Sequence, residues 1–385
     1  MIVGWIASAA WGADPAGERE KLERRTERWS ERTERAQERL EAAEDPKEAA
    51  RAERGLVDTR FRLVDLARRL DAWEAPAATV EVLFATNRDP SARGFGARDA
   101  DRLSYGVATV YVPERHPRGL MERELEVRAI RPLTEEGFQI ALHGALLAAG
   151  PEAEVLTYVH GYNNSFDYAA RRTAQIANDL EPSVVPVLFT WPSRGGEWFA
   201  GAKYTYDENA AARSSTAFAE VLEQLVDGSG APVNVLAHSM GARVVSDALV
   251  DLDRRGAVGR GFDDLVFAAP DIDAVTFGRR YQELSLATAG RVTIYCASDD
   301  RALAVSRSVH GGYDRLGTCR PETIAALEQP RFDFVDASKL YVDVLDHDKV
   351  ADSPRLLDDL GAVVRGVPPE QRALVSKGDH FELPP

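Results

Sequence analysis

The chain has 385 residues, of which 44% are hydrophobic, so it is long enough for a sizeable core in one large domain or two ordinary ones. Its formal net charge of −15 argues against general affinity for nucleic acid or for an anionic membrane surface. The two cysteines, Cys296 and Cys319, are too few for a disulfide framework or a cysteine-rich zinc site. One disulfide between them remains possible, but two separate core thiols are the preferred expectation.

Residues 1–16 are expected to form an apolar leader or tail that is too short to span a bilayer. The stretch resembles the apolar region of a signal peptide, but the positive region that normally precedes it is missing. A truncated signal peptide and an apolar tail both fit this pattern. The leader favours a secreted or cell-envelope location over a cytoplasmic one, and no membrane-spanning segment is expected.

Residues 17–75 are rich in alternating Glu and Arg and predict a helical hairpin. Apolar or small residues recur between Leu22 and Ala43 at a four-three spacing, which is typical of a thin coiled-coil stripe. Pro46 ends this pattern and is well placed to begin a second helix. The expected antiparallel hairpin either packs on its own domain or mediates tethering or self-association through residues 17–75.

Residues 76–385 are expected to form an α/β catalytic domain. A glycine-rich loop is expected after the first of its strands, and 332–336 is the last strand expected. Strands are predicted at 79–86, 104–113, 125–130, 154–160, 184–191, 232–238, 264–269, 291–297 and 332–336. Helices are predicted at 167–180, 209–226 and from Ser353-Pro354 onward. This alternation predicts a mostly parallel, doubly wound sheet with ligands beyond the carboxyl ends of its strands.

The stretch PVNVLAHSMG at 232–241 ends a buried strand at Ser239 and passes directly into a helical pattern. A nucleophile elbow needs this strand–turn–helix context, because the strained turn raises the serine Oγ above the sheet. Gly241 supplies the small residue needed two positions after the serine, and Ala237 stands where a glycine is usual. A buried serine at an ordinary strand end is the alternative, but the placement favours a nucleophile.

A serine nucleophile needs a base that removes the Oγ proton. His347 follows the last predicted strand, where an α/β hydrolase places its base, and it is preferred over His310 and His380. His238 adjoins the serine and is expected to point away from it across the turn.

The imidazole in turn needs a carboxylate that fixes its tautomer. Asp300 follows the penultimate strand, within reach of the loop after the last one, and is preferred over Asp299. Asp271 and Asp273 are expected instead to cap the next helix.

The oxyanion donors are expected to be the backbone amides of Met240 and Tyr162, with Asn163 as the alternative to Tyr162. Met240 directly follows the serine, and Tyr162 lies in the loop after strand 154–160. Loops at the same edge are expected to contact substrate, and their candidate residues are His160, Gly161, Trp191 and Ser193.

Seven segments together resemble a known family. They are FATNR at 84–88, HGYNNSF at 160–166, TWPS at 190–193, LAHSMG at 236–241, APDID at 269–273, DRAL at 300–303 and RLG at 315–317. From residue 79 to 366 the chain resembles the bacterial α/β-hydrolase family filed as domain of unknown function nine hundred. The resemblance implies an α/β-hydrolase fold and a triad of Ser239, Asp300 and His347. The family's usual Gly-His-Ser-Tyr run is replaced here by Asp346-His347-Asp348-Lys349, and the hairpin lies outside the resemblance.

These observations predict a serine hydrolase that cleaves an ester or related acyl bond without a metal or cofactor. Its substrate is expected to be a small-molecule or lipid-like acyl compound, and no nucleic-acid partner is expected. A peptidase, a lipase or an acyltransferase uses the same fold and remains an alternative. A second alternative is an interaction protein in which the hairpin does the work and the hydrolase site is idle.

Overall fold

The computed structural model describes residues 15–43, 45–71, 77–92, 94–121, 124–180, 183–194, 201–257, 261–340 and 349–384. Most of the apolar leader, residues 1–14, therefore lies outside the described residues. The chain divides into two compact units, one made of 1–76 with 114–118 and the other of the remaining residues.

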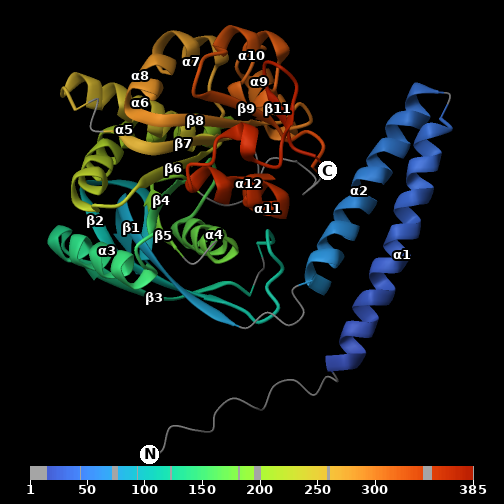
Figure 1. The fold of residues 1–385 in the computed structure, drawn as a ribbon, viewed down its shortest axis with the longest axis horizontal. Coiled ribbons are helices and arrows are strands. Elements are labelled where there is room, and N and C mark those ends of the chain that lie inside the picture. The colour runs from blue at the N-terminus through green and yellow to red at the C-terminus, as the bar shows by residue number, and fades with distance from the viewer. Residues whose placement is uncertain are drawn as a thin grey trace, which may run out of the picture. The chain divides into compact units, whose positions relative to one another are not determined.

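The smaller unit contains the predicted antiparallel helical hairpin, formed by α1 (Pro15–Glu41) and α2 (Pro46–Asp71) (Figure 1). The second helix begins at Pro46, as the sequence predicts. Leu22 and Leu56 are buried, and Arg60 donates a hydrogen bond of 3.0 Å from α2 to the Gln37 side chain on α1. Among the described helices, none combines the length and the apolar character that crossing a membrane requires.

The larger unit is built on a single mixed sheet (Figure 1). Its strands are β1 (Ala78–Ser91), β2 (Gly94–Val112), β3 (Glu126–Leu133), β4 (Glu154–Val159), β5 (Val184–Thr190), β6 (Val233–His238), β7 (Phe262–Ala268), β8 (Ala289–Cys296), β9 (Phe332–Asp336), β10 (Val375–Ser376) and β11 (Phe381–Glu382). They lie in the order β10-β11-β9-β8-β7-β6-β4-β5-β1-β2-β3. From β9 to β1 all neighbouring pairs are parallel, whereas β1, β2 and β3 pair antiparallel at one edge.

Helices cover both faces of this sheet (Figure 1). They are α3 (Glu135–Ala149), α4 (Phe166–Asp179), α5 (Gly201–Gly228), α6 (Gly241–Arg254), α7 (Ala274–Arg280), α8 (Gln282–Thr288), α9 (Arg301–Val309), α10 (Pro321–Leu327), α11 (Lys349–Asp352) and α12 (Pro354–Val364), with short 3₁₀ turns η1 (Leu316–Thr318) and η2 (Pro369–Gln371). One hydrophobic cluster includes side chains of α3, α5 and α6, and a second includes those of α4 and α12. The predicted doubly wound, mostly parallel architecture is confirmed.

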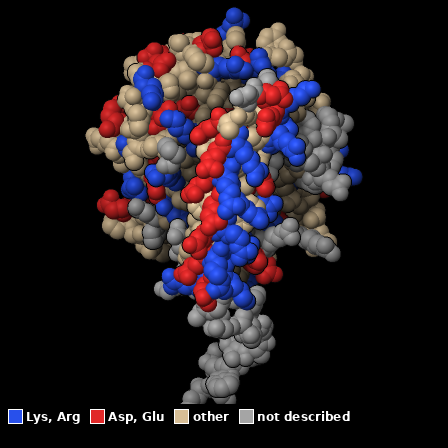
Figure 2. Space-filling model, turned by 90° about the vertical axis from the view of Figure 1, so that its right-hand side faces the viewer, with Lys and Arg blue, Asp and Glu red and all other residues tan. Residues whose placement is uncertain are grey.

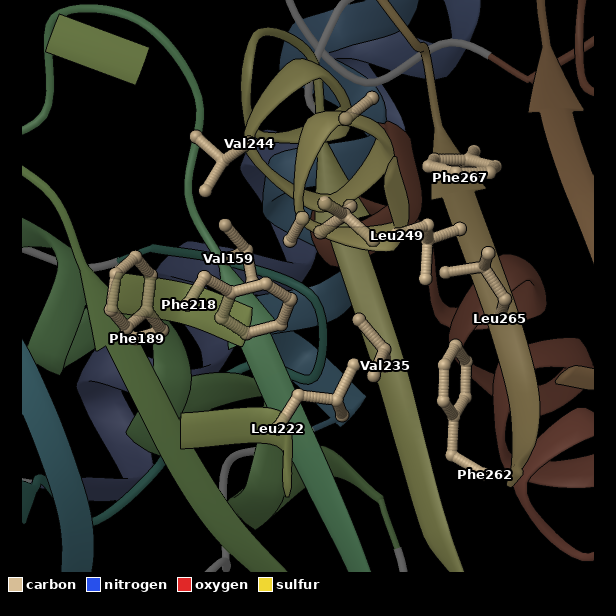
Figure 3. Close-up of a cluster of buried hydrophobic side chains, with 14 of the residues drawn as sticks. Val159, Phe189, Phe218, Leu222, Val235, Val244, Leu249, Phe262, Leu265 and Phe267 are labelled. Atoms are coloured by element: carbon tan, nitrogen blue, oxygen red, sulfur yellow. The ribbon is translucent and has the colours of Figure 1, made fainter. Parts of the chain in front are cut away.

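Strand β6 lies in the middle of the sheet, and each of its residues is buried. Figure 3 shows Val235 on β6 near Val159 on β4 and Leu265 on β7, with Leu222 of α5 and Leu249 of α6 packed over the same face. Full burial of an aliphatic side chain of this size contributes about 1.5–3 kcal/mol. This packing gives the turn that follows β6 a rigid support.

Two predictions about strands are wrong. The glycine-rich loop expected between 86 and 104 is instead a long antiparallel hairpin, in which Arg88 faces Asp99 and Ser91 faces Gly94. The register shifts on both sides of Arg88, which breaks the alternation that marks a strand in sequence. The strand at 332–336 is also not the last, because β10 and β11 follow it; with two residues each, they are too short to produce a periodic pattern.

Cys296 and Cys319 form a disulfide, so the preference for two separate thiols is also wrong. Cys296 ends β8, and Cys319 follows η1 in the left-handed backbone region at φ +48°. The Ala297 amide donates to the Gly317 carbonyl at 2.9 Å, which brings the two segments together. The disulfide therefore fixes η1 against the end of β8, four residues before Asp300.

Removal of this disulfide is expected to destabilise the larger unit. The bond closes a loop with a sequence separation of 23, and the chain-entropy model gives about 3 kcal/mol for a loop of this size. The double variant Cys296→Ala, Cys319→Ala should therefore show a lower urea midpoint than the wild type. Reductant should shift the wild type to the same midpoint and leave the double variant unchanged. Equal midpoints for oxidised wild type and double variant would contradict this expectation.

Candidate active site

Ser239 occupies a strained turn between β6 and α6. Its φ is +51°, in the left-handed region that residues with a Cβ rarely adopt. The Ser239 amide donates to the Ala268 carbonyl at 2.9 Å, and the Ser239 carbonyl accepts from the amides of Ala242 at 3.1 Å and Asp271 at 3.2 Å. These bonds hold the turn to the ends of β6 and β7, so the strain is maintained by the surrounding sheet.

Two glycines allow the chain to close around this turn. A Cβ on Gly241 would lie 2.5 Å from the His160 carbonyl oxygen and closer still to that of Val159. A Cβ on Gly161 would lie 2.8 Å from the Ser239 Cβ. The loop after β4 can therefore approach the serine only because both positions lack a side chain.

The acid candidates follow β8, two strands from β6 in the sheet. Asp300 is buried, whereas Asp299 is partly exposed. The Asp300 carboxylate accepts a hydrogen bond of 2.9 Å from the Leu303 amide and so caps α9. This bond fixes its side chain at the carboxyl edge of the sheet, on the same edge as Ser239.

His347, the preferred base, lies outside the described residues, in the segment between β9 and α11. Strand β9 is the parallel neighbour of β8, so this segment starts beside the loop that carries Asp300. The two alternative histidines are bound to carboxylates elsewhere. His310 Nε2 lies 2.8 Å from Glu208 Oε1, and His380 Nδ1 lies 2.7 Å from Asp379 Oδ1. Within the described part of the chain, neither ring contacts Ser239.

The two expected oxyanion donors belong to neighbouring segments. Met240 is the N-cap residue of α6, where backbone amides point out of the helix end. Tyr162 and Asn163 lie in the loop after β4, and the Asn163 amide donates to Asp207 at 3.1 Å. Because the Asn163 amide already has a carboxylate acceptor, we retain Tyr162 as the expected second donor.

Three of the residues expected to touch substrate make internal contacts in this structure. His160, Trp191 and Ser193 have no exposed surface. His160 Nδ1 lies 2.9 Å from the Gly161 carbonyl, the Trp191 amide donates to His160 Nε2 at 3.2 Å, and the two rings stack at 5.0 Å. Burial, reinforced by the nearby Arg88 charge, holds the pKa of His160 well below its usual value. These contacts support the loop after β4, and contact of these residues with substrate stays a prediction.

A family model described as "Alpha/beta hydrolase of unknown function (DUF900)" matches residues 139–364, which is more than half of the chain. The chain belongs to this α/β-hydrolase family. A comparison with curated proteins gives no match. Within the described residues of this hydrolase, no group of three or more His, Cys, Asp or Glu side chains is arranged to hold a metal ion.

Asp273 of the hydrolase caps α7 through a hydrogen bond of 2.7 Å from the Thr276 amide, as predicted. Asp271 does not cap a helix. Its buried carboxylate accepts hydrogen bonds from Tyr204 and from Ser306, at 2.7 Å for the latter, and forms an ion pair of 3.2 Å with Arg315. Burial alone would raise its pKa, but the charges of Arg243 and Arg315 lower it, so the carboxylate stays ionised.

Two residues of the hydrogen-bond network around Asp271 belong to segments that carry the family resemblance. Asp271 belongs to APDID and Arg315 to RLG, but no sequence pattern within either segment assigns them as partners. The Asp271 backbone amide donates to the Ser239 carbonyl, so the network lies directly behind the turn. It anchors the segment that follows β7 to the serine turn.

Proposed function

We propose that this α/β hydrolase is a serine hydrolase that cleaves an ester or related acyl bond through an acyl-serine intermediate. The observation that carries the proposal is Ser239 held at φ +51° between a buried strand and a helix, with Gly161 and Gly241 both in contact range. Such a turn stores strain that packing alone does not require, and it raises a serine Oγ above the strand ends.

In the proposed reaction the Ser239 Oγ attacks the acyl carbon while His347 takes its proton. Asp300 orients the imidazole and stabilises its positive charge. The amides of Met240 and Tyr162 donate to the oxyanion of the tetrahedral intermediate. The imidazolium then protonates the leaving oxygen as its bond to the acyl carbon breaks, and a water molecule repeats the sequence to release the acid from Ser239.

A panel of acyl esters of increasing chain length tests this proposal. Wild type is expected to hydrolyse at least one member, with turnover that saturates and is lost in Ser239→Ala. Hydrolysis at equal rates by wild type and Ser239→Ala would refute serine catalysis. A folded wild type without turnover on esters, thioesters or amides would favour the interaction protein with an idle site.

We further propose that the hairpin mediates self-association. Exposed acidic residues repeat every seven positions along α1, and exposed basic residues repeat beside them: Glu20, Glu27, Glu34 and Glu41, and Lys21, Arg28 and Arg35. Figure 2 shows the resulting acidic and basic columns side by side over the hairpin. A two-fold axis parallel to the helices would place the acidic column of one copy opposite the basic column of the other. If the two copies of α1 were antiparallel, columns of like charge would lie opposite each other. The charge columns therefore favour a parallel dimer.

Charge reversal tests this dimer. Replacing Lys21, Arg28 and Arg35 with glutamate is expected to produce monomers at low salt, because each copy then presents two acidic columns. High salt should weaken the wild-type dimer, since exposed ion pairs are screened. A further reversal of Glu20, Glu27 and Glu34 to lysine should restore association. A wild type that sediments as a monomer at low salt would refute the proposal.

The disulfide is consistent with an oxidising compartment, where such bonds persist. We therefore propose a secreted or cell-envelope location.

A further inference from the structure

Arg88 is a buried cation that contacts three separate segments. It is 1% exposed and lies on β1, at the register shift of the β1–β2 hairpin. Its Nε donates to Thr190 Oγ1 at 2.8 Å, its Nη1 to the carbonyls of Gly96 at 2.9 Å and Ser193 at 3.0 Å, and its Nη2 to the Asn164 carbonyl at 2.7 Å. The planar guanidinium thus ties the β1–β2 hairpin to the loops after β4 and β5.

Asp207 on α5 is a buried anion that holds the same loops through their donors. Its carboxylate accepts from Ser193 Oγ at 2.6 Å, from the Asn163 amide at 3.1 Å and from the Arg194 amide at 3.0 Å. Ser193 Oγ in turn accepts from the Asn164 amide at 3.0 Å. Asp207 therefore holds the Asn163 amide directly and the Asn164 amide through Ser193 Oγ, while the Asn164 carbonyl accepts from Arg88.

These two charges are costly to bury, and they do not neutralise each other by direct contact. In the described part of the chain Arg88 forms no ion pair, and its partners are neutral hydroxyls and carbonyls, with His160 Nε2 at 3.3 Å. Burial lowers the pKa of Arg88 to about 9, and burial also raises that of Asp207. A buried charge whose partners are neutral hydroxyl, carbonyl and amide groups contributes little net stability. Packing alone therefore does not explain why Arg88 and Asp207 are buried here.

The loop held in this way carries the proposed second oxyanion donor. Asn163 has a φ of +61°, and the Asn164 side chain donates to the Tyr162 carbonyl at 2.7 Å. The Gly161 carbonyl shares a peptide plane with the Tyr162 amide, and it accepts from the Asn164 side-chain amide at 3.2 Å and lies 2.9 Å from His160 Nδ1. This peptide plane therefore has little freedom to turn. Oxyanion stabilisation depends on donors that are oriented before the reaction begins.

We propose that Arg88 and Asp207 are a pair of positioning residues that hold residues 160–164 so that the Tyr162 amide faces the oxyanion. The inference rests on the proposed serine hydrolase function. The positioning role gives residues of the FATNR, HGYNNSF and TWPS segments a common function, because Arg88, Asn164 and Ser193 contact one another directly. Both charged groups are buried, so we expect them to act on the rate through the loop.

The test uses the conservative variants Arg88→Lys and Asp207→Asn in the full chain. A lysine ammonium cannot span the acceptors that the guanidinium fork reaches, and an asparagine presents an N–H group to one of the three donors. We expect kcat on the best ester to fall by about 10- to 100-fold with KM within about twofold, because a transition-state interaction is lost. Amide hydrogen exchange in peptides covering 160–166 should become faster.

Arg213 and Asp99 provide the matched control. They form an exposed ion pair of 2.7 Å between α5 and the β1–β2 hairpin, the same elements that carry Asp207 and Arg88. Arg213→Lys and Asp99→Asn should leave kcat and exchange in 160–166 at wild-type values. Wild-type kcat and exchange in both Arg88→Lys and Asp207→Asn would overturn the inference and leave the hydrolase proposal intact. If wild type hydrolyses no ester, the hydrolase proposal fails, and unchanged exchange would separately overturn the positioning role.

Discussion

Replacing Ser239 with alanine is expected to lower kcat/KM for ester hydrolysis by about 10⁴-fold or more, because loss of a nucleophile removes the covalent route altogether. Stability should change little, since alanine keeps the Cβ, the same strained backbone and the same backbone hydrogen bonds. Initial rates on the acyl-ester panel and the urea midpoint measure the two effects separately.

Ser246 offers a matched control for this substitution. It is a fully buried serine on α6, the helix that begins just after Ser239. Ser246→Ala removes the same atom from the same neighbourhood and should retain wild-type turnover. Equal loss of activity in Ser246→Ala and Ser239→Ala would show that packing near the turn, rather than the Ser239 hydroxyl, controls the rate.

Gly241→Ala is expected to destabilise the larger unit by about 3 kcal/mol or more, because the added methyl would press on rigid backbone rather than on a flexible side chain. Its Cβ would meet the carbonyl oxygens of Val159 and His160 at the end of β4. The loop after β4 would have to move away from Ser239, so activity should fall even in the fraction that remains folded. Urea unfolding and ester turnover per folded molecule measure the two consequences.

Gly144→Ala is the control for this change. Gly144 lies exposed on α3, and nothing lies within 4 Å of the place where its Cβ would stand. Alanine there should stabilise the protein by about 0.5–1 kcal/mol, because glycine is a poor helix former. A Gly241→Ala variant that is as stable and active as Gly144→Ala would mean that the turn around Ser239 is much looser than described.

The sequence predicted the parallel strands of the larger unit and their order along the chain, because buried parallel strands appear as continuous apolar runs. The run that ends at Ser239 and the helical pattern after it were sufficient to place β6, the turn and α6. The order of serine, acid and base candidates along the chain followed from the order of these strands. The positive φ at Ser239 and the approach of Gly161 agree with what the pattern predicts for that turn.

Other features could not be predicted because they depend on contacts between distant segments. Arg88 lies in an irregular hairpin, and its partners come from residues up to 105 positions away. Asp207 lies just before the helix predicted at 209–226, although α5 already begins at Gly201, and nothing local indicates its three donors. The disulfide between Cys296 and Cys319 depends on η1 folding back against β8, which spacing alone does not determine.

The most direct measurement is to treat the folded wild-type protein with a fluorophosphonate and locate the adduct by peptide mass spectrometry. The probe reacts with a serine only when its hydroxyl is activated and an oxyanion site is present. We expect one adduct, on the peptide that contains Ser239, and none in Ser239→Ala. An unmodified Ser239 in folded wild type, or an adduct that persists in Ser239→Ala, would contradict serine catalysis at this turn.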